Sequence, residues 1–372
     1  MNKKLRVAVV FGGASSEHGI SCATAAGVLS AIDRDRFDVV PVGITRAGQW
    51  ILAADDADRL RLEGANVPEV VASDGAALTV GLGKGAQSLV AVDAANGASR
   101  VLGGNQIDVV LPLLHGPFGE DGTIQGLFEM AGVPYVGSGV LSSAVAMDKH
   151  YMKVVLESAG LPVGRYEVIT AAQWERDPAA AIARASELPF PVFVKPCRAG
   201  SSIGITKVKA PEGLTSAIEE AQEHDPKVII EAGVDGREIE IAVLGSPTGP
   251  ARTTLPGEII VGGGHEFYTY EAKYFDEDAA DLVWPAELPE ETAARARDLA
   301  VESFEALSCE GLARVDLFYV DGGDLLVNEV NTMPGFTPFS MYPLMWQRSG
   351  LSYTELITEL IDLALARPKG LR

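Results

Sequence analysis

Four polar residues near the C-terminus have the types and the spacing of a site for a divalent cation. Two β-rich runs flank Gly322-Gly323, and this pattern predicts a β-hairpin with a two-residue turn. Side chains on one face of a strand repeat every second residue, so the four residues share a face of the hairpin. They are Arg314, Asp316, Glu329 and Asn331, with Asp316 opposite Glu329 and Arg314 opposite Asn331.

This polar face predicts magnesium binding. Two carboxylates directly opposite each other repel, and carboxylate and amide oxygens are hard ligands that suit Mg²⁺, which also binds substrate phosphates. The alternative is a solvated face of an edge hairpin. The metal site is favoured because the other face of the hairpin is apolar, formed by Val315, Leu317, Val320 and Leu326.

Composition limits the class of protein. The 372 residues suffice for two or three domains, and 47% hydrophobic with 22% charged residues is typical of a soluble globular protein. The net charge of −21 argues against nucleic acid or an anionic membrane as the main partner. An anionic substrate must therefore meet individual, locally placed lysines and arginines.

The cysteines and the N-terminus predict a cytoplasmic protein. Cys22, Cys197 and Cys309 have neither metal-site nor disulfide-framework spacing, which favours a reducing compartment. The apolar run after the first basic residues is too short for a signal peptide and ends in Gly-Gly, so we interpret it as a first strand. No stretch approaches the length of a membrane span.

The N-terminal third predicts an open α/β sheet. Residues 5–11 form a buried-type strand followed by a glycine turn and a helix, and strands at 37–44 and 107–114 extend the sheet. The G-x-G-x-x-G fingerprint is absent, which argues against a dehydrogenase. Residues 53–100 are rich in Ala, Gly and Asp and are interpreted as an insertion of short elements.

Two residues of this third follow strands and are candidates for ligand binding, because strand ends in open α/β sheets face the ligand crevice. Glu17 lies in a first helical turn, where it could instead complement the helix dipole. His115 follows the 107–114 strand, where a structural role is an equal alternative.

The middle of the chain carries two candidate lysines. Lys149 lies within a predicted helix over 141–160, where a solvated role is the alternative. Residues 191–209 predict a strand, a loop of small residues and a second strand, with Lys195 at the end of the first strand. Such a loop exposes N–H groups that can fold over phosphates, although many hairpins have Gly-Ser loops.

The remaining segments predict an α+β unit with a lid. A helix over 212–224 and strands over 227–234 and 237–245 precede an aperiodic segment, 265–281, with several aromatic residues. Long aperiodic loops in compact domains are usually functional lids or disordered, and aromatic residues make disorder improbable here. A helix over 289–308 leads into the hairpin.

Taken in order, seven motifs resemble the D-alanine–D-alanine ligase family of the ATP-grasp superfamily. They are GGASSEHGIS, HGPFGEDG, YVGSGVLSSAVAMDK, FVKPCRAGSSIG, YEAKY, GLARVD and NEVNTMPGFTPFSMYP. The resemblance runs from about residue 5 to 365 and leaves the 53–100 insertion uncovered. It implies an α/β protein, α+β in its C-terminal half, with the three-domain ATP-grasp architecture. The implied domains are an N-terminal open α/β domain (1–137), a central subdomain with the phosphate loop (138–230) and a C-terminal subdomain with the hairpin and lid (231–372).

The resemblance also implies the reaction. ATP and two Mg²⁺ ions, or Mn²⁺, would activate one D-alanine as an acyl phosphate, and the amine of a second D-alanine would attack it. The product, D-alanyl-D-alanine, would serve peptidoglycan precursor synthesis in the cytoplasm. A homodimer is the assembly that the family suggests.

Site residues follow from matching the family motifs position by position. The ATP-binding positions would be Lys149, Lys195, Ser202, Glu231, Val234 and Glu238, and the metal ligands Asp316, Glu329 and Asn331. A lysine common in the family directly after Glu231 is Ala232 here, which leaves adenine contacts at that position open. The catalytic positions would be Glu17, Ser201, Tyr274, Arg314, Gly335 and Ser340, and the substrate-binding positions His115, Lys273 and Met341.

Two alternatives to this function are weighed. A ligase for D-lactate or D-serine keeps the mechanism, but Tyr274 favours the dipeptide because relatives that make D-alanyl-D-lactate lack this tyrosine. A nucleotide-binding regulator without catalysis predicts the loss of a metal ligand or of Arg314, and the sequence retains all of them.

Overall fold

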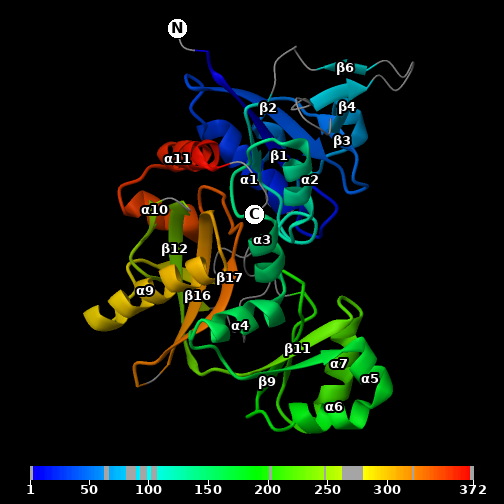
Figure 1. Cartoon of the computed structure of the whole chain (residues 1–372), viewed down its shortest axis with the longest axis vertical. Helices are drawn as coiled ribbons and strands as arrows, with labels where there is room; N and C mark the ends of the chain where they lie inside the picture. The colour runs from blue at the N-terminus through cyan, green and yellow to red at the C-terminus, as the bar shows by residue number, and fades with distance from the viewer. Residues whose placement is uncertain are drawn as a thin grey trace.

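Three β-sheets organise the part of the chain that the structure describes (Figure 1). The computed structural model describes residues 3–62, 67–80, 89–92, 99–101, 107–200, 203–246, 249–261, 280–320 and 322–368. The mixture of helices and sheets confirms the predicted α/β class. No helix within these ranges is both long and apolar enough to span a bilayer.

The N-terminal sheet has a parallel centre with antiparallel additions. Its strands, in spatial order, are β6 (Ser99–Val101), β5 (Leu89–Val92), β4 (Ala76–Val80), β3 (Trp50–Leu52), β2 (Phe37–Ile44), β1 (Leu5–Gly12) and β7 (Val109–Pro112). β1 pairs in parallel with β2 and β7, as the buried apolar runs predict. The predicted insertion contributes β4, β5 and β6, which extend the same sheet by antiparallel pairing.

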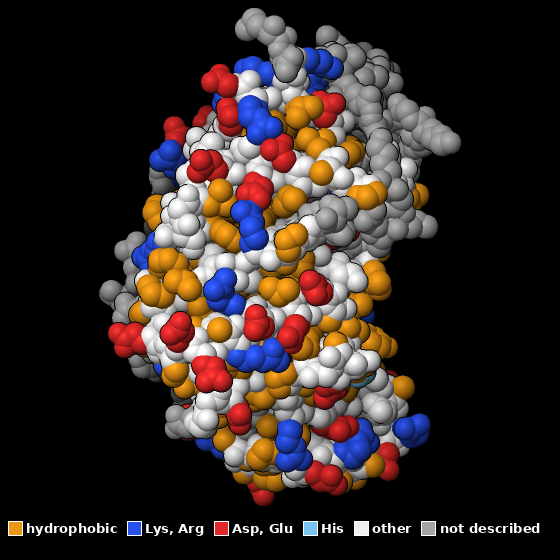
Figure 2. Space-filling model, turned by 60° about the vertical axis from the view of Figure 1, so that its left-hand side comes forward, with side chains coloured by type: hydrophobic (Ala, Val, Ile, Leu, Met, Phe, Trp, Pro, Cys, Tyr) orange, Lys and Arg blue, Asp and Glu red, His pale blue; other side chains and the backbone are white. Residues whose placement is uncertain are grey.

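Helices follow the parallel strands of this sheet. Helix α1 (His18–Ala31) follows β1 after a short turn, and helix α2 (Thr123–Ala131) follows β7. On the face of the molecule in Figure 2, Lys and Arg side chains are scattered among acidic ones over the described surface.

The helix predicted over 141–160 is in fact two helices, α3 (Val140–Met147) and α4 (Lys149–Ser158). Asp148 breaks it with extended backbone angles, φ −91° and ψ 100°, and its side chain accepts a hydrogen bond from the N–H of Tyr151. Asp148 is therefore an N-cap. The break places Lys149 at the first position of α4 instead of in a helix interior.

The central sheet confirms the predicted strand–loop–strand. Its order is β10 (Thr206–Val208), β9 (Val192–Pro196), β11 (Lys227–Ala232) and β8 (Tyr166–Thr170), all antiparallel neighbours. The helices next to it are α5 (Ala171–Arg176), α6 (Pro178–Ala185) and α7 (Leu214–Gln222). The buried side chains of α6 and α7 share a core with β9 and β11.

The C-terminal sheet contains the predicted hairpin. Its order is β15 (Ala280–Val283), β14 (Gly257–Val261), β12 (Gly236–Ser246), β16 (Gly311–Val320) and β17 (Leu325–Asn331), and β13 (Gly249–Thr253) also pairs with β12. Helix α9 (Glu290–Ala306) packs with α4 against the apolar face of this sheet.

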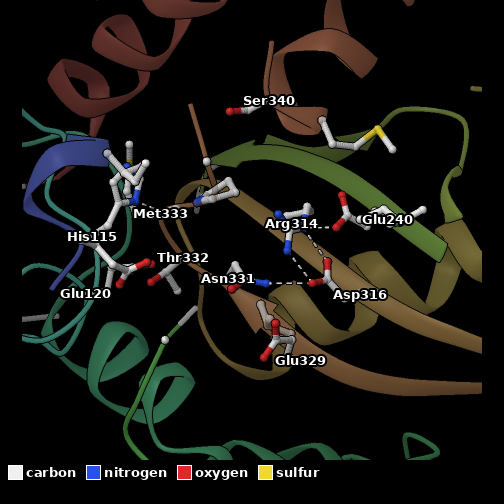
Figure 3. A pocket seen from close by; sticks show the side chains of 18 of the residues that line it. His115, Glu120, Glu240, Arg314, Asp316, Glu329, Asn331, Thr332, Met333 and Ser340 are labelled. Carbon is white, nitrogen blue, oxygen red and sulfur yellow. Dashed lines mark hydrogen bonds and ion pairs between the residues drawn. The ribbon is translucent and has the colours of Figure 1, made fainter. Parts of the chain in front are cut away.

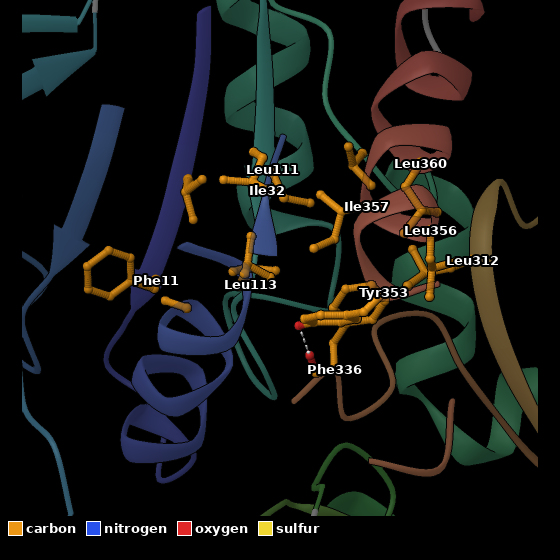
Figure 4. Close-up of a cluster of buried hydrophobic side chains, with 14 of the residues drawn as sticks. Phe11, Ile32, Leu111, Leu113, Leu312, Phe336, Tyr353, Leu356, Ile357 and Leu360 are labelled. Carbon is orange, nitrogen blue, oxygen red and sulfur yellow. Dashed lines mark hydrogen bonds between the residues drawn. The ribbon is translucent and has the colours of Figure 1, made fainter. Parts of the chain in front are cut away.

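The last two helices return to the N-terminal sheet. Side chains of α10 (Met341–Arg348) and α11 (Tyr353–Ala366) lie in one core with β1, α1 and β7. In Figure 4, Tyr353, Leu356 and Ile357 of α11 face this core, and the hydroxyl of Tyr353 donates a hydrogen bond to the carbonyl of Phe336 at 2.6 Å. The loop before α10, which carries Gly335 and Ser340, is thereby fixed to the core.

Candidate active site

A cavity of about 1110 Å³ lies where the three sheets meet. Its wall includes Glu17 and His115 from the N-terminal sheet, Lys195 from the central sheet and Arg314 from the C-terminal sheet. All of the described residues that were predicted to form the site line it. They are Glu17, His115, Lys149, Lys195, Glu231, Val234, Glu238, Arg314, Asp316, Glu329, Asn331, Gly335, Ser340 and Met341. The predicted Ser201, Ser202, Lys273 and Tyr274 lie outside the described residues.

The hairpin has the predicted register at the site, but not for the predicted reason. Arg314 pairs with Asn331 and Asp316 with Glu329, whereas nearer the turn Leu317 pairs with Val327. The turn is longer than two residues, because the N–H of Val320 bonds to the carbonyl of Asp324.

An extra residue in β17 restores the predicted pairing at the site although the turn is longer than predicted. Asn328 has no partner of its own between the Asp316–Glu329 and Leu317–Val327 pairs, so it forms a β-bulge. Asn328 and Glu329 both line the cavity as a result. The prediction that Leu326 lies on the apolar face is wrong, since Leu326 pairs with Phe318, which lines the cavity, while Leu325 and Val327 are buried on the other side.

Arg314 and Asp316 form the centre of the polar face (Figure 3). The guanidinium donates to both oxygens of Asp316, at 2.7 and 2.6 Å, and lies 3.1 Å from a carboxylate oxygen of Glu240. Asn331 donates its side-chain amide to Asp316 at 3.0 Å. Burial lowers the pKa of Arg314, but Asp316 and Glu240 outweigh it and raise this pKa well above its ordinary value. Arg314 is therefore a permanent cation facing the cavity.

Glu329 and Asp316 fit the donor chemistry of a hard cation. Both carboxylates come from adjacent strands and line the cavity with Asn331, and Lys149 Nζ lies 3.8 Å from Glu329. Among the described residues, no group of three or more His, Cys, Asp or Glu is placed to hold a metal ion. A metal here would take Asn331 and ligand oxygens as further donors, as Mg²⁺ commonly does.

Glu231 is held between two lysines. Its carboxylate oxygens lie 2.5 Å from Lys195 Nζ and 2.8 Å from Lys153 Nζ. Burial favours a raised pKa for Glu231, but both ammonium groups outweigh burial and lower it. Lys153 was not predicted, although it lies four residues after Lys149, a spacing that places the two lysines on one face of a helix.

The small-residue loop after β9 is anchored at its stem. Arg198 forms a bidentate pair with Asp225, with contacts of 2.9 and 2.6 Å, and Lys227 contacts the helix-capping Asp148 at 2.5 and 2.7 Å. Lys149 Nζ donates to the carbonyl of Ala199 at 3.0 Å. The stem of the loop and the start of α4 are therefore tied together.

Three titratable groups meet at the N-terminal side of the cavity. Glu17 is buried against two glycines, since a Cβ on Gly116 or Gly200 would lie 2.4 or 2.9 Å from its carboxylate. Burial lowers the pKa of His115, whose ring nitrogens lie 3.2 Å from the carbonyl of Met333 and 3.3 Å from the hydroxyl of Thr24. His115 is therefore neutral at physiological pH.

Glu120 joins this group, and residue patterns did not single it out. Burial, and then the charge of Glu17, raise the pKa of Glu120 to about 8. Its carboxylate accepts a hydrogen bond from the N–H of Gly116 at 2.5 Å. The signal that could have identified it is its place in the HGPFGEDG motif, directly after Gly119. Glu240 was not predicted as a site residue either. It lies two residues after Glu238 on β12, so both side chains are on the same face of the strand, and both line the cavity.

Ser340 and Gly335 lie side by side in the loop before α10. A Cβ on Gly335 would lie 3.1 Å from Ser340 Oγ, and this hydroxyl accepts a hydrogen bond from the N–H of Thr337 at 3.1 Å. Met341 is buried at the start of α10 and also lines the cavity. The structure therefore brings together all predicted site residues that it describes.

Comparison with known proteins agrees with this arrangement. Two family models match, "D-ala D-ala ligase N-terminus" over residues 6–138 and "D-ala D-ala ligase C-terminus" over residues 155–362. The first match spans the 53–100 segment that the motif resemblance left uncovered.

Relatives over nearly the whole chain carry the same name. D-alanine–D-alanine ligases of Pseudarthrobacter chlorophenolicus and Kineococcus radiotolerans are 58% and 54% identical, each over 99% of this chain and over 96% and 99% of their own lengths. Among solved structures, the VanG D-Ala:D-Ser ligase of Enterococcus faecalis has a TM-score of 0.84 at 35% identity, covering 97% of this chain and 100% of its own. The D-alanine–D-alanine ligase of Coxiella burnetii has a TM-score of 0.81 at 32% identity, covering 98% and 94%. The chain belongs to the D-alanine–D-alanine ligase family.

Proposed function

We propose that this cavity joins two D-alanine molecules to D-alanyl-D-alanine at the expense of ATP, through a D-alanyl phosphate, for peptidoglycan precursor synthesis. The observation that carries the proposal is the juxtaposition, in one cavity, of the Arg314–Asp316 pair and Glu329 with Lys149 and Lys195. An activated carboxylate and a triphosphate both need cations, and the protein carries a net charge of −21. The curated relatives at 52–58% identity share this activity by name.

ATP would occupy the end of the cavity between the central and C-terminal sheets. Lys149 and Lys195 line that end and would contact the phosphates. Glu231, Val234 and Glu238 lie beside them and would hold adenine and ribose, with Ser202 of the small-residue loop over the phosphates. This division follows the charges, since Lys149 lies 3.8 Å from Glu329 and Lys195 lies 2.5 Å from Glu231.

Asp316, Glu329 and Asn331 would hold the divalent cations, Mg²⁺ or Mn²⁺. Bound there, such ions would neutralise the negative charge on the phosphates during phosphoryl transfer. The Arg314 pair with Asp316 keeps that carboxylate oriented toward the cavity.

The D-alanine subsites would lie on the other side. Glu17 would bind the ammonium of the first D-alanine, in a network with Ser201 and Tyr274, and Arg314 with the Gly335 N–H would stabilise the oxyanion that forms on attack. Lys273, Ser340 and Met341 would surround the transferred phosphate and the second carboxylate, and His115 would border these subsites. The segment 265–281 would exclude water from the acyl phosphate.

The alternative acceptors are not favoured. The D-Ala:D-Ser ligase neighbour is 35% identical, whereas the D-alanine–D-alanine ligases named above reach 58%. We also propose domain limits at 1–137, 138–230 and 231–372, a homodimer and a cytoplasmic location.

Phosphate release from ATP and Mg²⁺ with D-alanine, L-alanine, or D-alanine plus D-lactate or D-serine tests the function, with products identified by mass. D-Alanine-dependent release with D-alanyl-D-alanine as the product supports it. A mixed product from D-lactate or D-serine in preference to the dipeptide would reassign the acceptor. ATP binding without turnover on any of these substrates would contradict a ligase.

A further inference from the structure

Lys153 is a buried lysine that the proposed chemistry does not use. Its side chain is 3% exposed, and it is not among the described residues that line the cavity. Its ammonium contacts Glu231 at 2.8 Å, donates to the carbonyl of Asn328 at 3.3 Å and lies 6.0 Å from the ring centre of Tyr166. Burial removes a lysine ammonium from water at a cost in free energy, so a buried lysine needs a partner that compensates for the lost solvation.

The partner of Lys153 is shared with a cavity residue. Glu231 contacts Lys153 with one oxygen and Lys195 with the other, and Lys195 faces the cavity. The three side chains together carry one net positive charge. With Lys153 replaced by a neutral residue, Glu231 would neutralise Lys195 completely. Because Lys153 shares Glu231, Lys195 is not fully neutralised and the cavity wall keeps a net positive charge.

Lys153 also joins the two sheets that border the nucleotide end of the cavity. Glu231 belongs to β11 of the central sheet, whereas Asn328 is the bulged residue of β17 in the C-terminal sheet. Asn328 directly precedes Glu329. The ammonium of Lys153 on α4 therefore contacts two groups, the carboxylate of Glu231 that pairs with Lys195 and the backbone carbonyl directly before Glu329.

We propose that Lys153 is a positioning residue for the nucleoside triphosphate, which balances Glu231 so that Lys195 attracts the phosphates and which holds the bulge that orients Glu329. This inference rests on the proposed function, because it requires triphosphate at the Lys195 end of the cavity. Lys153 acts through Glu231 and Asn328 and touches neither substrate.

The test compares Lys153→Met with Lys153→Arg. It also compares the double variant Lys153→Met/Glu231→Gln with Glu231→Gln alone, because Glu231 is itself proposed to contact the nucleotide and both of these variants lack it. Methionine keeps the unbranched apolar stem and removes the charge. Lys4→Met is the matched control, because Lys4 is an exposed lysine directly before β1. Its replacement changes the net charge of the protein by the same amount as Lys153→Met. Thermal melting of each variant reports on folding, and initial rates give kcat and the KM for ATP and for D-alanine.

Lys153→Met is expected to raise the KM for ATP on the order of ten- to a hundredfold, the usual effect of removing a partner that orients a ligating group. The KM for D-alanine is expected to stay within about twofold, since Lys153 contacts only the nucleotide side. Lys153→Arg should recover most of the ATP affinity because it keeps the charge. In the Glu231→Gln background, Lys153→Met should raise the KM for ATP by less than it does in the wild type, because no carboxylate is left to neutralise Lys195.

An unchanged KM for ATP in a folded, active Lys153→Met protein would overturn the inference, as would an equal rise in both KM values. A double variant whose KM for ATP exceeds that of Glu231→Gln on the order of tenfold or more would overturn the charge balance, and this comparison remains available where Lys153→Met alone is destabilised. Absence of ligase activity in the wild-type protein would instead overturn the proposed function, so the two failures are distinguishable.

Discussion

The guanidinium of Arg314 spans both carboxylate oxygens of Asp316, two positions along the same strand and on the same face. Such a bidentate pair fixes the direction of both side chains. Arg314, which we propose to stabilise the oxyanion, and Asp316, which we propose to bind the metal, are therefore held by each other.

Arg314→Met is expected to lower kcat on the order of 10²- to 10³-fold, the usual loss on removing one oxyanion donor. The variant also leaves the partly buried Asp316 without its bidentate partner. Steady-state kinetics with D-alanine and ATP check this, with Arg295→Met on the exposed side of α9 as the control. A kcat within a few-fold of wild type would remove Arg314 from the chemistry.

Glu329→Gln should abolish turnover and leave the fold intact, because it removes the charge at the predicted metal site without changing side-chain volume. The measurements are phosphate release over a range of Mg²⁺ and Mn²⁺ concentrations, and circular dichroism. Glu302→Gln, at an exposed position of α9, is the matched control. Near-normal activity in Glu329→Gln would contradict its role as a ligand.

Glu120 makes stability depend on pH. Its pKa is about 8 in the folded protein, above its ordinary value, so the folded state binds more protons than the unfolded state between the two values. Its contribution is therefore fully present below the ordinary carboxyl pKa and is lost as pH rises through 8. Urea unfolding between pH 5 and pH 9 should show this loss in the wild type and a flatter profile in Glu120→Gln. Parallel profiles would exclude Glu120 as the source.

Arg367 closes the C-terminal end onto the N-terminal part of the chain. Directly after α11, its guanidinium contacts Glu129 at 2.8 Å and Glu310 at 2.9 Å, donates to the hydroxyl of Tyr135 at 2.8 Å, and is 9% exposed. Arg367→Met should lower the free energy of unfolding on the order of 3 kcal/mol, because it removes the guanidinium from two partly buried carboxylates. Chemical denaturation checks this, and Arg367→Lys should lose less. A change within experimental error would show that water replaces these contacts.

The sequence correctly predicted which residues of the hairpin lie opposite each other at the site, but the two-residue turn from which this was inferred is wrong. Opposed positions at the site follow from a two-residue turn, yet the turn is longer and the Asn328 bulge restores the register. Alternation identifies which side chains share a face, but it carries no signal for one extra residue in a strand. The wrong placement of Leu326 has the same cause.

Contacts between distant segments account for what else was missed. Asp148 ends a helix that periodicity alone continues, and Lys227, which holds it, is 79 positions away. Lys153 and Glu120 looked ordinary because their charged neighbours, Glu231 for Lys153 and Glu17 for Glu120, lie far away in the sequence. Helix and strand patterns depend on neighbours in sequence, whereas these charges depend on the assembled fold.

The packing of α11 against β1 has a consequence for biosynthesis. A ribosome releases the first strand long before the last helix exists, so the N-terminal sheet emerges with the surface that will receive Tyr353, Leu356 and Ile357 still uncovered. That core closes only after α11 has been translated. Nascent chains stalled before residue 353 should therefore expose apolar surface to chaperones, and chains that include α11 should bury it.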